Sequence, residues 1–558
     1  MRCGDFCKYK GFSQLIAEAC GVLFGADSDL PSIVAAILQK RQSGVICRCL
    51  DILKPQYYVI EYEYIDRDFM EDYSHYYSRC FKQYPRTCCR VHFFGFGVGV
   101  EEIKGVLLGV EDDRWRDRLD SIIESYLGFI VLRPLPPTVY SRICLRPVLT
   151  GDAALATTEI SVHLFGATLQ VRTTPFQEQD SVVAACATSA LWSAFQITGR
   201  QSPHCIPSPH RITRVATEGG ACESRAFPSK GLTIGEIGRA IFKMGLSQQS
   251  LSTYNQEMFR AEVYAYLRLG IPLILCGTIR EPGKKRDSEN WHAVTIVGFH
   301  IPEGDSGVSC GNVFVHGAAI DRLYCHDDRL GPFFEFVGEP ENRDDDNKDG
   351  AMIKWKTYER KRVLMSDFTL GNDYERFTVK SVIAPVYHKL RIGLTDVLDE
   401  LELLNEKILV YLEEVGFADK FDIHHMTWDL YLSSSVDLKK RSRNASTGLD
   451  GQLVAKICSE PMPKYVWVAS AFEKDRRLGT FLVDATGIAQ DIDVFTFIEG
   501  EDGFKAILYS IAKMVVDSTK CMEPRVFEED TDAESCIATK YLIAEARNPF
   551  IRHLISLI

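Results

Sequence analysis

The spacing of apolar positions predicts alternating strands and helices in the first part of the chain. Short runs of apolar and aromatic residues predict strands at 57–62, 90–94 and 129–132. Apolar residues that recur every three or four positions predict helices at 67–84 and 112–126. Elements that alternate in this way indicate an α/β domain, which we place at residues 1–155.

The middle of the chain changes from a helical to a strand-like pattern. Two alternating segments around Gly166 predict a β-hairpin with strands at 159–165 and 168–172. Helical spacing follows at 183–196, 233–245 and 256–269. Apolar and β-branched runs then predict strands at 271–276, 292–299, 312–316 and 322–326. We assign residues 156–390 to one α+β domain in which helices precede the sheet.

The last part of the chain, residues 391–558, is predicted to be a separate α+β domain. Leucine and isoleucine residues recur on one side of a predicted helix at 397–415, and strands are predicted around 466–468 and 481–483. The helix is open to two interpretations, as a core element or as an interface. A chain of 558 residues is too long for one core, which agrees with three domains.

The composition indicates a soluble protein without a nucleic-acid or membrane partner. Hydrophobic residues make up 46% and charged residues 25% of the chain, which are ordinary values for a globular protein. The net charge of -12 argues against a general nucleic-acid binder. No apolar run approaches the ~20 residues of a membrane span, and residues 12–25 lack the order of a signal peptide.

The 18 cysteines are scattered over the whole chain, many inside apolar runs such as that around Cys276. In a chain of this size the pattern favours buried free thiols in a reducing compartment over a disulfide framework. We therefore expect a cytoplasmic protein.

One cysteine stands where a reactive thiol is expected. Cys186 follows Asp180 and Ser181, which are good N-cap residues, and it lies in an alanine-rich helical run. The first turn of a helix favours a thiolate through its unsatisfied N–H groups and the macrodipole. The alternative is that Cys186 is a small buried residue in a closely packed helix.

Three further side chains complete a possible catalytic set in the chain order Gln179, Cys186, His292 and Asp327. His292 begins a β-branched strand, and Asp327 ends another strand. Each alone has an ordinary structural explanation, at a strand edge or in a turn. Together they supply a nucleophile, a proton shuttle, an orienting carboxylate and an amide for the oxyanion.

The segment Gln179–Leu191, with Trp291-His292-Ala293-Val294 and Asp327-x-x-x-Gly331, resembles the papain-like cysteine peptidase clan, and within it the double-glycine (bacteriocin-leader-processing) peptidases. The resemblance covers about residues 172–390. It implies a helical half followed by an antiparallel sheet half. It also implies that Cys186 is the nucleophile and His292 the general base and acid. Asp327 would orient His292, and Gln179 would bind the oxyanion with a backbone N–H near Cys186.

The chain departs from this family pattern at three places. Ala187 stands where many relatives have glycine. Gln179 lies one residue further from Cys186 than the pattern has it, which leaves Gln177 as an alternative. Asp328 stands where many relatives have proline, so it is a rival of Asp327. The chain has no transporter segment, so processing of an exported leader peptide is not expected.

The sequence therefore predicts a cytoplasmic cysteine peptidase that hydrolyses a peptide or isopeptide bond through an acyl-enzyme on Cys186. Its partner would be a protein or peptide substrate, and the flanking domains could bind a partner or self-associate. A bacterial defence or conflict effector is one context that the architecture suggests. The alternatives are a papain-fold acyltransferase or deamidase, and a catalytically inactive papain-like binding module.

Several weaker motifs predict no metal or cofactor site. The acidic segment 345–350 begins like a calcium loop, but Lys356 stands where a glutamate ligand is needed. The glycines at 95–99 lack the second half of a dinucleotide-binding fingerprint. The N-terminal cysteine pairs lack the spacing of a zinc site. The basic run 284–286 precedes His292 and could face an acidic substrate.

Overall fold

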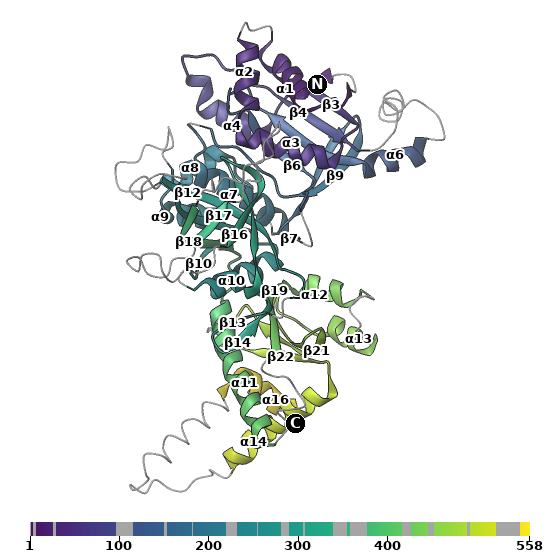
Figure 1. Ribbon diagram of the computed structural model, residues 1–558, viewed down its shortest axis with the longest axis vertical. Helices are drawn as coiled ribbons and strands as arrows, with labels where there is room; N and C mark the ends of the chain where they lie inside the picture. The colour runs from purple at the N-terminus through teal and green to yellow at the C-terminus, as the bar shows by residue number, and fades with distance from the viewer. Residues whose placement is uncertain are drawn as a thin grey trace, which may run out of the picture. The chain divides into compact units, whose positions relative to one another are not determined.

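The computed structural model has a mixed α+β fold, as the sequence predicts (Figure 1). It describes residues 2–3, 7–25, 29–95, 115–149, 153–180, 182–202, 204–218, 231–253, 255–280, 290–304, 307–338, 354–357, 376–415, 426–444, 451–487, 492–520 and 547–557. The segments 96–99, 284–286 and 345–350 lie outside these residues. Contacts divide the chain into two compact units. Unit 1 comprises Met1–Thr253, Gly270–His300 and Asp321–Val386, and unit 2 comprises Tyr254–Leu269, Ile301–Ile320 and Tyr387–Ile558.

Unit 1 begins with an antiparallel sheet in the order β1-β3-β4-β5-β6, with β2 paired to β3. Its strands are β1 (Arg2–Cys3), β2 (Cys7–Lys8), β3 (Tyr57–Tyr64), β4 (Cys88–Phe94), β5 (Tyr126–Leu132) and β6 (Tyr140–Leu145). The accompanying helices are α1 (Phe12–Phe24), α2 (Leu30–Leu38), α3 (Arg41–Leu53), α4 (Arg67–His75), the short 3-10 turn η1 (Tyr77–Arg79) and α6 (Trp115–Glu124). The predicted helix at 67–84 is therefore shorter, since α4 ends at His75.

Both faces of this sheet are covered, which explains the continuous apolar run of β5. Tyr126, Phe129 and Val131 belong to one buried cluster, which includes residues of α4, α6 and a later hairpin. Leu127 and Ile130 belong to the other, which includes residues of α1, α2 and α3. Successive side chains of a strand point to opposite faces, so a strand buried on both faces needs apolar residues at every position.

A second sheet in unit 1 closes into a ring. Its order is β10-β18-β11-β12-β15-β16-β17, β17 also pairs with β18, and β7 pairs with β12, all antiparallel. The strands are β7 (Ala153–Leu155), β10 (Ser247–Leu251), β11 (Leu273–Arg280), β12 (Asn290–His300), β15 (Arg322–Asp327), β16 (Gly331–Gly338), β17 (Lys354–Thr357) and β18 (Arg376–Val386). The helices that precede most of them are α7 (Cys186–Gln201), α8 (Pro209–Thr217) and α9 (Ile234–Lys243).

The predicted hairpin is confirmed as β8 (Thr158–Leu164) and β9 (Ala167–Thr173), paired in register from Thr158–Thr173 to Leu164–Ala167. Phe165 and Gly166 form its two-residue loop with φ of 51° and 84°. Positive φ at both loop residues is the geometry that fits the twist of a hairpin. Alternate residues of β8 are buried, as the alternating sequence predicts.

Unit 2 has a six-stranded sheet in the order β13-β14-β19-β20-β21-β22. The strands are β13 (Val308–Cys310), β14 (Val313–Val315), β19 (Met426–Ser434), β20 (Tyr465–Glu473), β21 (Arg476–Asp484) and β22 (Val494–Glu499). The helices are α10 (Gln256–Arg268), η3 (His316–Ala319), α11 (Leu394–Glu414), α12 (Ser435–Ser442), α13 (Gly451–Ser459), α14 (Asp502–Lys520) and α16 (Pro549–Leu557). The apolar face of α11 is buried through Leu401, Leu404 and Ile408, so the predicted helix at 397–415 is a core element of this unit.

The compact units do not follow the predicted domain boundaries at 155 and 390. Tyr254–Leu269 and Ile301–Ile320 lie within the predicted central domain but pack in unit 2. The three-domain division stays a prediction. None of the helices in the described part of the chain has the length and hydropathy of a membrane span.

Candidate active site

Cys186 is the first residue of α7, so the prediction that it lies in the first turn is confirmed. Ala185 is the N-cap residue and offers no side-chain acceptor to the helix. The first N–H groups of a helix have no partner within it, so α7 presents donors beside a half-buried thiol. N–H donors in this position can bind an oxyanion that develops on a substrate beside the thiol.

The expectation that Asp180 caps the helix is wrong, because its side chain binds the turn before it. Asp180 Oδ1 accepts from the N–H groups of Val182, Val183 and Ala184 at 2.8, 2.5 and 2.9 Å. Its Oδ2 accepts from Tyr77 Oη at 2.5 Å. Asp180 thus fixes the turn that leads to Cys186, and the helix begins three residues later than its alanines suggest. Ser181 lies outside the described residues.

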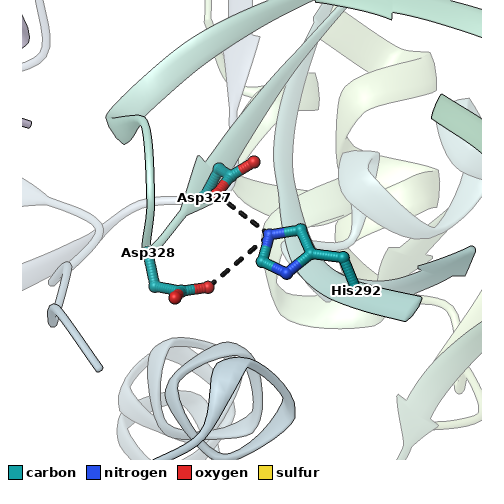
Figure 2. A group of neighbouring side chains, drawn as sticks. All are labelled: His292, Asp327 and Asp328. Carbon is teal, nitrogen blue, oxygen red and sulfur yellow. Dashed lines mark hydrogen bonds and ion pairs between the residues drawn. The ribbon is translucent and has the colours of Figure 1, made fainter. Parts of the chain in front are cut away.

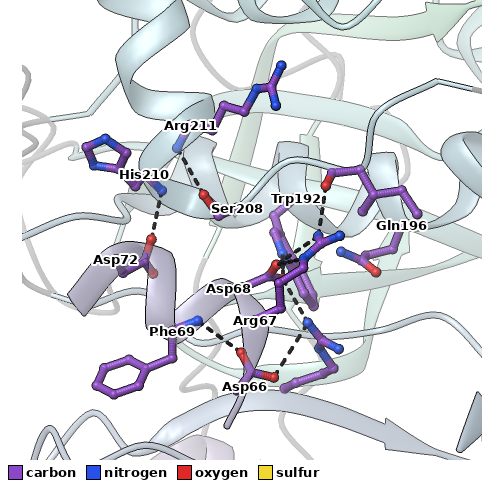
Figure 3. A network of polar contacts seen from close by, with 12 residues as sticks. Asp66, Arg67, Asp68, Phe69, Asp72, Trp192, Gln196, Ser208, His210 and Arg211 are labelled. Atoms are coloured by element: carbon purple, nitrogen blue, oxygen red, sulfur yellow. Dashed lines mark hydrogen bonds and ion pairs between the residues drawn. The ribbon is translucent and has the colours of Figure 1, made fainter. Parts of the chain in front are cut away.

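Hydrogen bonds hold the helix α7 to β12 and to α4. Thr295 Oγ1 on β12 donates to the Ala190 carbonyl at 2.8 Å. Trp192 Nε1 donates to Asp68 Oδ2 on α4 at 2.9 Å, and Asp72 Oδ1 of the same helix accepts from the backbone N–H of His210 on α8 at 3.0 Å (Figure 3). Buried polar groups therefore join α4, α7 and α8, and they set the position of the thiol relative to the sheet.

His292 lies on β12, opposite Gly277 of β11, and is buried. Its Nε2 is 3.0 Å from Asp327 Oδ1 and 3.6 Å from Asp328 Oδ1, at the end of β15 (Figure 2). The other ring nitrogen, Nδ1, points away from both carboxylates (Figure 2). Asp327 Oδ1 also accepts from the N–H of Arg329 at 2.9 Å, which holds the carboxylate in place.

The charges around His292 favour the imidazolium. Burial alone would lower its pKa, but Asp327 and Asp328, together with hydrogen bonds to the side chains of Asp327 and Cys186, raise the pKa well above its ordinary value. The imidazole therefore hydrogen-bonds a carboxylate and lies close enough to the Cys186 side chain to interact with it. These are the contacts that a thiolate–imidazolium pair needs.

The two aspartates have opposite electrostatic behaviour. Burial would raise the pKa of Asp327, but the neighbouring His292 and Arg329 lower it to about 2. Burial raises the pKa of Asp328 to about 7. The charge of Asp327 also raises this pKa, whereas His292 lowers it. Among the described residues, neither carboxylate oxygen of Asp328 has a hydrogen-bond partner. Asp327 is therefore the stable anion at neutral pH, and the geometry favours it as the orienting residue.

The same three side chains are the one group in the described chain that could hold a metal ion. Ligand atoms of His292, Asp327 and Asp328 lie within 4.8 Å of one another. However, the 3.0 Å contact between Nε2 and Asp327 Oδ1 is an ordinary hydrogen bond, and a third partner, Cys186, faces the histidine. The arrangement fits a histidine held by a carboxylate better than an ion site.

The oxyanion residue stays a prediction. Gln179 is half-buried in the segment without regular secondary structure that precedes α7. Gln177 is buried, and its Oε1 has no hydrogen-bond partner among the described residues. The structure therefore brings Cys186, His292 and the aspartates together, and it leaves Gln179 and Gln177 as alternatives.

Several other cysteines lie in surroundings that disfavour a thiolate. Burial raises the pKa of the thiols of Cys20 and Cys49 to about 11 and that of Cys144 to about 12. Burial and the charge of Cys186 raise the pKa of Cys276 to about 12, which places that strand residue near the candidate nucleophile. Thiols of this kind are poor nucleophiles at neutral pH.

Comparisons with known proteins give no match. No protein-family model matches the chain, and no curated protein or solved structure is detectably similar to it.

Proposed function

We propose that the chain is a cysteine peptidase of papain-like plan that hydrolyses a peptide or isopeptide bond. The observation that carries this proposal is the position of one buried imidazole, His292, which hydrogen-bonds Asp327 and also interacts with the side chain of Cys186. The order of elements supports it, because helix α7 with the thiol precedes the antiparallel ring with His292 and Asp327.

The residues would divide the reaction as follows. The Cys186 thiolate attacks the substrate carbonyl carbon, and the oxyanion binds N–H groups at the start of α7, with Gln179 as the predicted side-chain donor. The His292 imidazolium donates its proton to the leaving amine as the C–N bond breaks, which leaves a thioester on Cys186. His292 then takes a proton from water, and the resulting hydroxide attacks the thioester, which releases the carboxylic acid and regenerates the Cys186 thiolate beside the His292 imidazolium. Asp327 keeps the imidazole oriented throughout.

The cysteines whose side chains are described are all free thiols, which supports a reducing, cytoplasmic location as part of the proposal. The substrate would be a protein or peptide. Acyl transfer and side-chain deamidation would use the same thioester and differ in the acceptor or in the amide attacked. They remain alternative uses of the same site, as does an inactive module that binds protein.

An activated ester tests the chemistry without knowledge of the substrate. Wild-type protein should react with p-nitrophenyl acetate to give an acetyl group on Cys186, followed by its release, as measured by intact and peptide mass spectrometry. Cys186→Ala should remove that adduct while circular dichroism stays unchanged. Equal acetylation of Cys205, an exposed cysteine, in wild type would contradict a special nucleophile at Cys186.

A further inference from the structure

We infer that the N-terminal helix α3 is a working part of this site, and that Gln42 and the Lys40–Glu178 ion pair are positioning residues for the catalytic group. The inference rests on the proposed function. It assigns a role to the N-terminal region, for which the family resemblance implies none.

Gln42 binds the turn that carries the aspartates. Its side chain is buried, and Nε2 donates to the backbone carbonyl of Asp328 at 2.7 Å. The turn follows Asp327 directly, and Leu330 N donates back to the Asp327 carbonyl at 3.0 Å. The hydrogen bond from Gln42 on α3 therefore fixes the backbone next to Asp327, the carboxylate that binds His292.

A second contact brings α3 against the same turn. Gly331 ends it with φ of 128°, a conformation that residues with a side chain rarely adopt. A Cβ atom at this position would lie 3.0 Å from Cβ of Val45 on α3. Helix and turn are thus closely packed, since a Cβ atom at Gly331 would press on Val45, and α3 supports the turn at a second point.

Residues at the start of α3 also bind the segment that precedes Cys186. Glu178 lies eight positions before Cys186 and between Gln177 and Gln179, and it is buried. Its Oε1 pairs with Lys40 Nζ and lies 3.5 Å from Gln42 Nε2.

The remaining polar groups of Glu178 are bound by the N-terminal sheet. Its Oε2 accepts from the Tyr140 N–H at 3.2 Å, and its carbonyl accepts from Arg133 Nη2 at 3.0 Å. Burial raises the pKa of Glu178, whereas Lys40 and Arg133 lower it. The positive charge of Lys40 therefore favours the ionised form of Glu178.

These contacts make one connected group. Gln42 reaches both the Asp328 carbonyl and Glu178, and so it joins the segment before the nucleophile to the turn after the orienting carboxylate. The side-chain amide of Gln42 on α3 thus connects two segments that lie about 150 residues apart in the sequence. A small displacement of the turn after Asp327 would move this carboxylate away from His292. The fraction of His292 present as imidazolium, which stabilises a thiolate, would then fall.

The test uses the full chain and two substitutions. Gln42→Leu keeps the size of the side chain and removes its donors, and Gln14→Leu is the matched control, because Gln14 makes an exposed side-chain contact in α1. The readout is the rate at which iodoacetamide modifies Cys186 relative to exposed Cys205, followed across pH, together with the melting temperature. We expect Gln42→Leu to slow Cys186 at about pH 6.5 by roughly fivefold or more and to shift its labelling to higher pH. Gln14→Leu should change neither.

Lys40 provides a second pair in case Gln42→Leu does not fold. Lys40→Met leaves the buried Glu178 without its partner and should slow Cys186 labelling, whereas Lys40→Arg keeps the charge and should restore it. Wild-type rate and pH profile in a folded Gln42→Leu or Lys40→Met protein would overturn the positioning role.

His292→Ala separates this result from a failure of the proposed function. If His292→Ala slows Cys186 labelling and the α3 variants do not, the catalytic proposal stands and the positioning role is refuted. If His292→Ala leaves the labelling unchanged, the catalytic proposal itself fails and the positioning role fails with it.

Discussion

At the scale of single residues, the site depends on two neighbouring carboxylates that share one histidine. Asp327 is within hydrogen-bond distance of Nε2, whereas Asp328 Oδ1 lies 0.6 Å further away, at 3.6 Å rather than 3.0 Å. The sequence left open which of the two orients His292, because both follow the same strand. Three-dimensional geometry favours Asp327 and leaves Asp328 as a buried acid whose side-chain oxygens have no hydrogen bond among the described residues.

Asp328→Asn is expected to stabilise the protein above neutral pH. The pKa of Asp328 is raised to about 7, from about 3.9 in an unfolded chain. The unfolded chain therefore releases this proton first, so wild type loses stability as pH rises from about 4 to about 7. The amide of the Asp328→Asn variant has no such proton to release. The melting temperature of this variant should match wild type near pH 4 and exceed it by roughly 2–4 °C at pH 8.

Thermal unfolding of both proteins at several pH values measures this difference. A difference in melting temperature that does not change with pH would contradict a neutral acid at Asp328. Asp327→Asn is the matched comparison. The pKa of Asp327 is lowered to about 2, so its stabilisation is present above pH ~4 and is lost as pH falls towards 2.

At the scale of elements, the sequence predicted those whose pattern is local. The strands β3, β4 and β5, the hairpin β8–β9 and the helices α7, α9 and α10 all follow from apolar spacing. The start of α7 was predicted too early, since three N–H groups before it are bound by Asp180 and not by helical carbonyls.

Other elements were missed for two different reasons. The buried residues of α1, Phe12, Leu15, Ile16, Ala19 and Cys20, have helical spacing that was available in the sequence. By contrast, β18 lies between β10 and β11 although more than 90 residues separate it from β11 in the chain. No local pattern specifies such a pairing. For the same reason, local motifs indicated Cys186, His292 and Asp327 but not Gln42, whose role depends on tertiary contacts.

The polar network of α4 gives the prediction at this scale. Asp68 accepts from Trp192 Nε1 and pairs with Arg142 Nη2 at 2.8 Å. Asp68→Ala would leave the half-buried Arg142 guanidinium with a weaker partner, Asp66, at 3.6 Å, and should cost about 3–5 kcal/mol in the free energy of unfolding. Urea denaturation measures this loss.

An exposed ion pair provides the control. Lys243 lies 3.7 Å from Glu218 with about half of each side chain exposed, so Lys243→Ala should change little. Equal effects of Asp68→Ala and Lys243→Ala would show that the α4 network does not anchor α7.

At the scale of the whole molecule, the chain passes between its two compact units several times. Helix α10 lies between segments of unit 1 in sequence but packs in unit 2. There, Tyr264 Oη donates to Asp429 at 2.6 Å, and the rings of Tyr266 and Trp467 are 6.3 Å apart. A fragment that ends at the predicted boundary would therefore lose the partners of α10.

The fragment 1–390 is expected to expose this apolar helix. Phe259, Val263 and Leu267 are all buried in the full chain. Without residues 391–558 the fragment should bind the dye ANS strongly and associate in size-exclusion chromatography, because exposed apolar patches drive association. A monomeric fragment with the ANS binding of the full chain would support the three-domain division instead.

The most direct test of the account is competitive alkylation of the native protein. Limiting iodoacetamide at about pH 6.5, with modified cysteines mapped by mass spectrometry, compares wild type with His292→Ala. Because the Cys186 thiol contacts an imidazole whose pKa is raised by two carboxylates, Cys186 should be modified faster than exposed Cys205 in wild type and should lose that advantage without His292. Cys186 that reacts no faster than Cys205, or that reacts equally fast without His292, would contradict the thiolate–imidazolium pair and leave the protein-binding module as the better account.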